Sequence, residues 1–436
     1  MTVLHVDLNS FFARAEQQAN STFRDRPIGV LGKGHKGART CVVAASPEAK
    51  HWGVKSGMSV AEAEQRCPAI RLVAPNYARY LDISRRFITI LDRFSPWVEI
   101  FSIDEAFIAL QRNNSEVRIT NNELGSINPK GATKPLEFIQ HFEQTLPEAI
   151  SIAKNIKHAL ARELGELITC SIGIAWGKIF AKLAGELKKP DGLTVLSPDT
   201  WLETVGQLPV SELCGIGYQL TNSLNTLGVR TIEDLAHTDA GTLAARFGPS
   251  AGIRLWEIGQ GIDRAPVAPH TKLGMAKSIG HQITLDRVAR VDSLWPTITK
   301  LTTKVGRRMR RSGLWAGALS LDISLTSGSR LKGTLRLSEA AGEQALLTAS
   351  QQLFNQLIPN RHWAIRVGIV AHQLGNSTAT QILPCFPEEQ RQQQITHALD
   401  TLRDHYGEDV IGWGSAHHIH LGNLRDWRGP RAVLDQ

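Results

Sequence analysis

Two acidic motifs stand where a protein interior should be apolar. Asp7 ends the strand-like run of residues 2–7, and Asp104 and Glu105 lie inside the otherwise apolar run 98–110. A carboxylate removed from water needs a compensating charge, and oxygen ligands of this kind are the ones that Mg²⁺ prefers. Two such ions can bind the attacking and the leaving oxygen of a phosphoryl displacement. These residues therefore predict a metal-dependent phosphoryl-transfer site; the alternative is that Asp104 and Glu105 merely end a strand and solvate a turn.

Local sequence patterns predict the elements that must position these carboxylates. Leu4, Val6 and Leu8 alternate with residues of the opposite face, as in a strand with one buried face, so Asp7 points away from the apolar face. Asn9 and Ser10 offer an N-cap for a helix that begins at residue 11. We expect residues 98–110 to form one strand that lies beside residues 2–7 and brings the three carboxylates together.

The composition is that of an ordinary globular chain. Its 436 residues, of which 42% are hydrophobic and 21% charged, predict about three domains. No apolar run is long enough for a membrane span, and no signal peptide is visible, so we expect no membrane partner. Five widely separated cysteines favour reduced thiols and a cytoplasmic location; they are Cys41, Cys67, Cys170, Cys214 and Cys385.

Positive charge is concentrated in one segment. Residues 270–376 contain fifteen Lys/Arg and five Asp/Glu, a net charge of +10, whereas the whole chain carries +8. A basic segment on a nearly neutral body is typical of proteins that bind a phosphate backbone, and the alternative is a basic surface without such a partner. The densest cluster lies in an expected helix over residues 293–311 and consists of Arg307, Arg308, Arg310 and Arg311.

Taken together, residues 7–12 (DLNSFF) and 102–106 (SIDEA) resemble the signature of Y-family translesion DNA polymerases, in particular the bacterial DNA polymerase IV branch. The resemblance covers nearly the whole chain. It implies an α+β fold shaped as a right hand, with palm, fingers, a thumb containing a helix-hairpin-helix, and an additional little finger. The implied boundaries are palm 1–10 and 77–196 with an insertion near 111–135, fingers 11–76, thumb 197–263, linker 264–273, little finger 274–376 and a C-terminal tail 377–436.

The resemblance also implies a reaction and its site residues. The primer 3′-oxygen attacks the α-phosphate of a dNTP and pyrophosphate leaves, with two Mg²⁺ ions as cofactors. Asp7 and Asp104 would bridge the ions, and Glu105 would hold the ion that activates the 3′-oxygen. Phe12 would exclude a ribose 2′-hydroxyl as a steric gate, whereas Phe11 is expected in the core.

The triphosphate contacts implied by the resemblance are Lys50 and Lys189. Lys189 precedes a Pro-Asp-Gly turn that stops the expected helix 178–187, although a lysine before a turn is also common by chance. The fingers depart from the family pattern, because Pro47 and Lys50 replace a tyrosine and an arginine. Lysine lacks the bidentate fork of arginine, which puts catalytic efficiency in doubt. Asn9 stands where many relatives have aspartate.

The expected partners are primer–template DNA, a dNTP and a sliding clamp. Gly215 and Gly217 lie in a helix-hairpin-helix pattern whose backbone N–H groups suit a DNA phosphate, and the arginine cluster would track the duplex. A peptide resembling clamp-binding sequences of bacterial polymerases follows, with Gln381, Leu383 and Phe386 as its anchors. We expect a monomer.

Two other function classes remain open at this point. A DNA-damage accessory protein with DNA and clamp binding but little synthesis is favoured by Pro47 and Lys50, and the intact carboxylates argue against it. A two-metal nuclease would shorten a primer rather than extend it.

Overall fold

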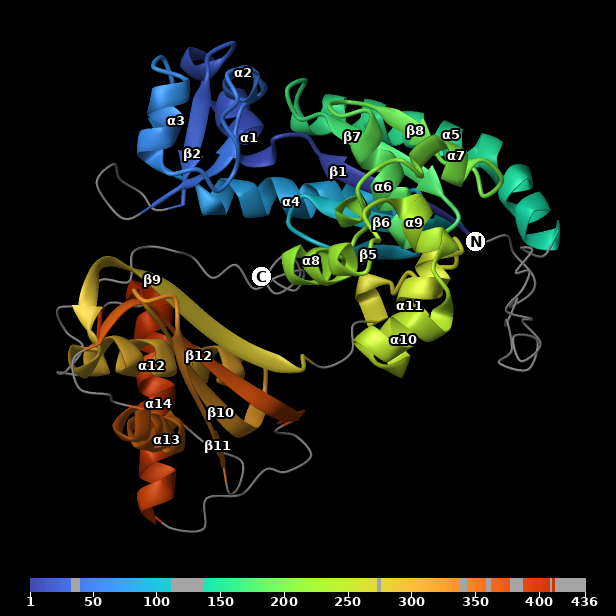
Figure 1. Ribbon diagram of the computed structural model, residues 1–436. Coiled ribbons are helices and arrows are strands. Elements are labelled where there is room, and N and C mark those ends of the chain that lie inside the picture. Colours follow the sequence, from blue (N-terminus) through green and yellow to red (C-terminus); the bar gives the residue numbers. More distant parts are fainter. Residues whose placement is uncertain are drawn as a thin grey trace. The chain divides into compact units, whose positions relative to one another are not determined.

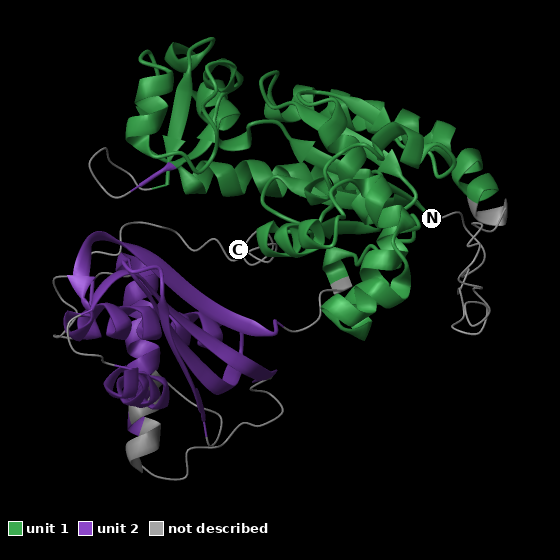
Figure 2. Cartoon of the chain, viewed as in Figure 1, with its two compact units in different colours: residues 1–32, 42–273, 425–436 green, residues 33–41, 274–424 purple. Residues whose placement is uncertain are grey.

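The chain divides into two compact units, each of which has its own hydrophobic core (Figure 1; Figure 2). The first contains residues 1–32, 42–273 and 425–436, and the second residues 33–41 and 274–424. Among the described residues, none of the helices combines the length and the apolar character that crossing a membrane requires. The computed structural model describes residues 1–32, 40–110, 136–272, 276–337, 343–357, 362–376, 387–407 and 410–411.

A five-stranded sheet forms the centre of the first unit, in the order β5-β6-β1-β7-β8. Strand β1 is antiparallel to both of its neighbours, β6 and β7, and β8 runs parallel to β7. The strand predicted near residues 2–7 is thereby confirmed, and it lies in the middle of the sheet. The strands are β1 (Thr2–Leu8), β5 (Val98–Ile100), β6 (Glu105–Leu110), β7 (Cys170–Ala175) and β8 (Leu193–Val195).

The prediction of one continuous strand over residues 98–110 is wrong, because β5 and β6 form a hairpin. Both Phe101 and Ser102 donate their backbone N–H to the Glu105 carbonyl, at 3.1 and 3.0 Å. The Ser102 hydroxyl donates to the Asp104 carboxylate, and the Asp104 backbone N–H donates back to that hydroxyl at 3.3 Å. Short polar side chains of this kind stabilise turns. Asp104 therefore lies in the turn, and Glu105 is the first residue of β6.

Helices cover both faces of the central sheet. On the face of Leu4 and Val6, α5 (Leu136–Leu164) contacts β1 and β7, and α4 (Tyr77–Asp92) packs against α5. On the opposite face, α6 (Lys178–Leu187) packs directly onto β7 and β1. A Cβ at Gly173 would lie 2.1 Å from the Ala181 carbonyl oxygen, so glycine is what permits this close approach.

A small three-stranded sheet with three short helices makes up the region between β1 and α4. Strand β2 is antiparallel to β3 and parallel to β4. Helix α1 begins at Phe11 as predicted, but Ser10 is no side-chain cap; it adopts a left-handed conformation with φ 48° and makes no capping bond. The elements are α1 (Phe11–Ala19), η1 (Ser21–Phe23), β2 (Ile28–Leu31), β3 (Val42–Ala45), α2 (Pro47–His51), α3 (Val60–Arg66) and β4 (Arg71–Val73).

Short helices follow β8 and include the predicted hairpin pair, α8 and α9. Gly215, in the turn before α8, has a φ of +98°, which explains why glycine occupies it. Gly217 is the N-cap of α8. The elements are α7 (Trp201–Val205), η2 (Val210–Glu212), α8 (Tyr218–Thr226), α9 (Ile232–His237), α10 (Ala240–Phe247), α11 (Pro249–Gly259) and η3 (His270–Lys272).

The second unit is an antiparallel sheet with helices on one face, in the order β11-β10-β12-β9. Helices α12 and α13 pack on the face that buries Leu319, Leu321 and Ile323. The helix predicted over residues 293–311 is confirmed as α12. The elements are β9 (Ser278–Arg290), η4 (Val291–Ser293), α12 (Trp295–Arg311), β10 (Leu314–Leu325), β11 (Arg330–Arg336), α13 (Glu343–Leu357), β12 (Trp363–Asn376) and α14 (Pro387–Tyr406).

Candidate active site

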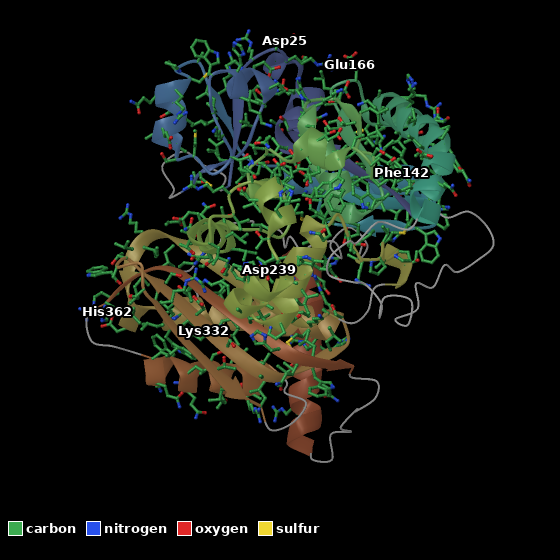
Figure 3. The ribbon with its side chains drawn as sticks, turned by 45° about the vertical axis from the view of Figure 1, so that its right-hand side comes forward. Asp25, Phe142, Glu166, Asp239, Lys332 and His362 are labelled. Atoms are coloured by element: carbon green, nitrogen blue, oxygen red, sulfur yellow. The ribbon has the colours of Figure 1, made fainter. Side chains whose placement is uncertain are left out.

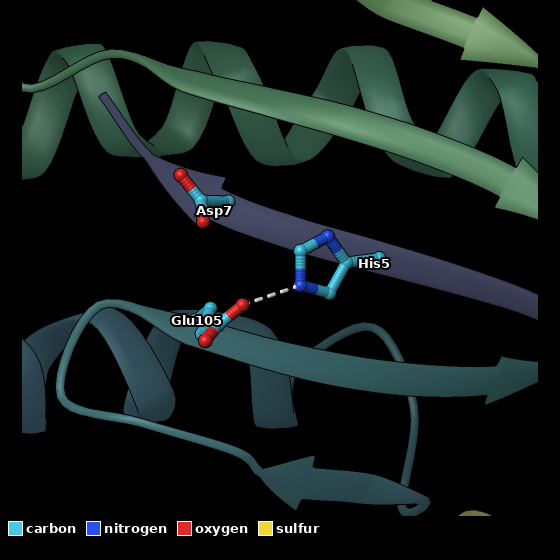
Figure 4. A group of neighbouring side chains, drawn as sticks. All are labelled: His5, Asp7 and Glu105. Carbon is cyan, nitrogen blue, oxygen red and sulfur yellow. Dashed lines mark hydrogen bonds and ion pairs between the residues drawn. The ribbon is translucent and has the colours of Figure 1, made fainter. Parts of the chain in front are cut away.

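The register of β1 and β6 places the predicted carboxylates side by side. Asp7 lies opposite Glu105, and both side chains are on the sheet face that also carries His5 (Figure 4). One ligand atom from each of these three residues lies within 4.8 Å of the other two. The Asp104 carboxylate, next in the chain to Glu105, is instead hydrogen-bonded to Ser102 and is not part of this group. The structure thus brings two of the three carboxylates into direct proximity, with the third adjacent.

Burial places the three carboxylates under different electrostatic conditions. Removal from water raises the pKa of Asp7, and the charges of Asp104 and Glu105 add to the rise. Burial likewise raises the pKa of Asp104, against the hydrogen bond from Ser102. Burial would also raise the pKa of Glu105, but hydrogen bonds from His5 and Lys182 outweigh it and lower that pKa to about 2.

The donor set fits divalent cations of the magnesium type. It consists of carboxylate oxygens at the same end of two neighbouring strands, where burial raises the pKa of Asp7 and Asp104. A bound cation would supply the missing positive charge. Mg²⁺ typically takes few protein carboxylates and completes its octahedron with other oxygens, which this number of ligands allows.

Lys189 points into the same site. Its Nζ lies 3.1 Å from Asp7 Oδ1 and 2.6 Å from Glu186 Oε1. The turn that carries it is fixed by Lys157, whose ammonium donates to the Asp191 side chain at 2.5 Å and to the Asp191 carbonyl at 2.9 Å. Asp7 and Glu186 raise the pKa of Lys189, against burial, so this lysine is kept cationic beside the carboxylates.

Lys50, on helix α2 beside the small sheet, is the second lysine near the site. Removal from solvent and the nearby Lys189 charge lower the pKa of Lys50, and Asp7 counteracts them. Pro47 is the first residue of α2, where proline is favoured, and the Ser46 hydroxyl accepts the Ala49 N–H at 3.3 Å. The proline that departs from the family pattern therefore has a local role in starting the helix that carries Lys50.

Asn9, the second departure, has a structural role that the sequence did not indicate. Its side chain is 6% exposed and lies 2.8 Å from the Ser171 hydroxyl and 3.1 Å from the Thr169 hydroxyl. These contacts tie the end of β1 to the start of β7. A neutral amide satisfies them without the cost of burying a further charge.

Phe12 has the aromatic support that a rigid gate requires. Its ring stacks on Tyr80 with a centroid distance of 4.2 Å and meets Tyr77 edge-on at 6.2 Å. The Tyr80 hydroxyl donates to Glu16 at 2.7 Å, which fixes the stacking partner. Phe11 is 3% exposed and belongs to the core, as expected, whereas Phe12 is only half-buried.

Most of the arginine cluster of α12, which the sequence assigns to DNA contact, is engaged in ion pairs within the second unit. Arg310 makes two bonds to Asp400 at 2.8 and 2.9 Å, and Arg307 and Arg311 both pair with Asp404. The fourth member, Arg308, donates to the Gly280 carbonyl at 2.9 Å, and Arg307 is 4% exposed. Arg307, Arg310 and Arg311 thus attach α14 to α12, because acidic residues at least ninety positions away in sequence pair with them.

A different basic surface lies on the outer face of the second sheet. Arg330, Lys332 and Arg336 alternate along β11 with residues that face the helices, and all three are exposed. Lys332 is labelled in Figure 3. The period-two spacing of basic residues is the signal that could have identified this surface in the sequence.

Two sets of predicted contacts are untested by this geometry. The turn containing Gly215 has open space around it, since a Cβ there would contact nothing within 4 Å. Gln381, Leu383 and Phe386, the expected clamp anchors, lie outside the described residues.

Family profiles match most of the chain and follow its domain organisation. The impB/mucB/samB family profile matches residues 6–186, a profile described as DNA polymerase-iota thumb domain matches 211–263, and the impB/mucB/samB C-terminal domain matches 276–383. With the sheet, the hairpin helices and the carboxylate pair in place, the chain belongs to the impB/mucB/samB family of Y-family polymerases.

Curated relatives named DNA polymerase IV align along nearly the full length. The chain is 34% identical to the one from Moorella thermoacetica over 420 residues, covering 94% of each protein. It is 30% identical to that of Bacillus velezensis, covering 95% of this chain and 92% of the relative. The family resemblance inferred from residues 7–12 and 102–106 is thereby confirmed.

Solved structures confirm the predicted fold class. A Y-family DNA polymerase chimera superposes with a TM-score of 0.70 at 23% identity, covering 86% of this chain and all of that chain. A post-insertion binary complex of Dbh DNA polymerase superposes with a TM-score of 0.54 at 23% identity, covering 86% of this chain and 100% of that chain.

Proposed function

We propose that this chain is a template-directed DNA polymerase of the error-prone translesion type, which adds dNTPs to a primer 3′-hydroxyl during DNA damage tolerance. The observation that carries the proposal is the meeting of Asp7 and Glu105, with Asp104 adjacent, on neighbouring strands of a family member's central sheet. Two Mg²⁺ ions bound there would polarise the α-phosphate and lower the pKa of the attacking hydroxyl. Asp7, Asp104 and Glu105 are the residues that would hold them.

The surrounding side chains supply positive charge and shape. Lys189, now paired with Asp7, and Lys50 would bind the triphosphate, so that Lys189 exchanges a carboxylate for a phosphate oxygen. Phe12, backed by Tyr80, would lie under the sugar and exclude a 2′-hydroxyl. In this arrangement the lysines orient the nucleotide and the phenylalanine selects the sugar.

Primer–template DNA would be held without base readout. The exposed basic residues of β11 and the open turn at Gly215 are the surfaces that suit a phosphate backbone. The sequence-based assignments of palm, fingers, thumb and little finger stay predictions at their boundaries. The sliding-clamp peptide, the cytoplasmic location and the monomeric state also stay predictions.

Primer extension with the full-length protein and Mg²⁺ tests the proposal. We expect the primer to lengthen by templated addition of dNTPs. Failure to extend, with DNA binding preserved, would select the accessory-protein alternative that Pro47 and Lys50 favour. Shortening of the primer would select the nuclease alternative.

Replacing Lys332 and Arg336 by alanine is expected to weaken duplex binding uniformly across sequences. Each lost phosphate contact should reduce the slope of log affinity against log salt by about 0.9. Fluorescence anisotropy at several salt concentrations measures this slope. Arg391→Ala, a basic residue on α14 away from the sheet, is the matched control, and an equal effect from it would contradict the assignment of this face.

A further inference from the structure

Two side chains, His5 and Lys182, bind the same oxygen of Glu105. His5 Nε2 lies 2.8 Å from Glu105 Oε2, and Lys182 Nζ donates to that same Oε2 (Figure 4 shows the His5 contact). Within the described part of the chain, no hydrogen bond reaches Oε1. The carboxylate is therefore anchored by one oxygen, and the other is left available to a ligand.

His5 is locked in place by the packing of α6. Its side chain is fully buried, its ring centroid lies 4.9 Å from that of Phe107, and a Cβ at Gly185 would come within 3.2 Å of Nδ1. Nδ1 has no hydrogen-bond partner among the described residues. Because a carboxylate only accepts, Nε2 carries the hydrogen that points at Glu105.

Lys182 reaches Glu105 from α6, on the helix face that also carries Lys178. The Nζ of Lys182 lies over the Phe101 ring, 5.1 Å from its centroid, and this contact restricts the Lys182 side chain further. Lys178, one turn earlier, makes an equivalent ion pair with Glu99 at 2.6 Å. The helix thus provides both a lysine at the site carboxylate and a matched lysine away from it.

We propose that His5 and Lys182 are positioning residues that fix Glu105 through Oε2 and leave Oε1 available to bind a cation. The proposal rests on the proposed function. His5 acts through Glu105, since its Nε2 hydrogen is already donated and Mg²⁺ prefers oxygen.

The direction in which the affinity for a divalent cation changes when Lys182 is replaced decides whether Lys182 is a positioning residue. Loss of a nearby positive charge by itself strengthens cation binding, whereas loss of a positioning contact weakens it, typically by about 10-fold to 100-fold. We therefore expect Lys182→Met to weaken Mn²⁺ binding by at least about 10-fold. Mn²⁺ titration of the full-length protein, followed by electron paramagnetic resonance, measures the affinity without turnover.

Three further variants complete the test. We expect His5→Gln to weaken Mn²⁺ binding and to raise the Mg²⁺ concentration needed for half-maximal extension, and Lys182→Arg to restore most of the affinity. Lys178→Met should leave both quantities as in the wild type. Tighter Mn²⁺ binding by Lys182→Met, unchanged binding in both Lys182→Met and His5→Gln, or an equal loss in Lys178→Met would overturn the proposal.

Spectroscopy of the wild type separates positioning from direct ligation. Bound Mn²⁺ should show no coupling to a histidine nitrogen, and such coupling would make His5 a ligand and overturn the positioning role. Wild-type protein that binds Mn²⁺ but does not extend primers would contradict the polymerase function alone, because the affinity differences among the variants would still measure positioning.

Discussion

Asp104→Asn is expected to reduce the rate of primer extension by about 10³-fold or more while leaving DNA binding intact. A metal ligand that stabilises the transferring phosphoryl group contributes several kcal/mol, and each 1.4 kcal/mol corresponds to about tenfold in rate. Single-turnover extension and anisotropy measure the two properties separately. Asp82→Asn, on the exposed face of α4, is the control and should extend normally.

The same substitution should stabilise the metal-free protein. Burial raises the pKa of Asp104, so its ionised form is less favourable in the folded than in the unfolded state. Asp104→Asn removes that cost at pH 7, and its advantage should shrink as the pH falls and Asp104 becomes protonated in the wild type. Thermal unfolding in chelator at several pH values tests this sign; a loss of stability at pH 7 would show that Asp104 is a structural residue.

Phe12→Ala is expected to lower discrimination against ribonucleotides by about 10²-fold. This factor corresponds to losing a steric clash of a few kcal/mol between the Phe12 ring and the 2′-hydroxyl of a ribonucleotide. Ratios of kcat/KM for dNTP and rNTP incorporation measure it. Extension with dNTPs should continue, since the substitution leaves the carboxylates and lysines of the site unchanged.

The neighbouring phenylalanine provides the comparison. Phe11 is buried in the core, so Phe11→Leu should destabilise the protein by about 1 kcal/mol and leave sugar discrimination unchanged. Unchanged discrimination in Phe12→Ala would remove Phe12 from the site, whatever its stacking on Tyr80.

The carboxylate pair was predictable because it depends on local periodicity. The alternation of Leu4, Val6 and Leu8 fixes which face carries Asp7, and the family motif supplies the partner strand. The prediction of one buried face is wrong, because Val3 and His5 on the other face are also buried. The hairpin between β5 and β6 was missed because its turn contains neither glycine nor proline and is flanked by apolar residues on both sides. The side-chain hydrogen bonds described for this turn join Ser102 and Asp104, which are neighbours in sequence.

Long-range pairing explains the other differences. Nothing in the sequence around Arg310 indicates that Asp400 will neutralise it, since a charge cluster looks the same whether water or a helix covers it. The sequence indicates part of the role of His5, because the period-two pattern of the strand places His5 on the same face as Asp7. Its bond to Glu105 needed the register of two strands a hundred residues apart.

The central position of β1 has a consequence for synthesis of the chain. This strand is synthesised before both of its neighbours in the sheet, and its last residue pairs with Cys170, about 160 residues later. At 5–20 residues per second, the hydrogen-bonding edge of β1 that pairs with β7 remains without its partner for roughly 8–30 s. The nascent polypeptide therefore carries an unpaired strand throughout that interval, and unpaired strand edges are prone to aggregation.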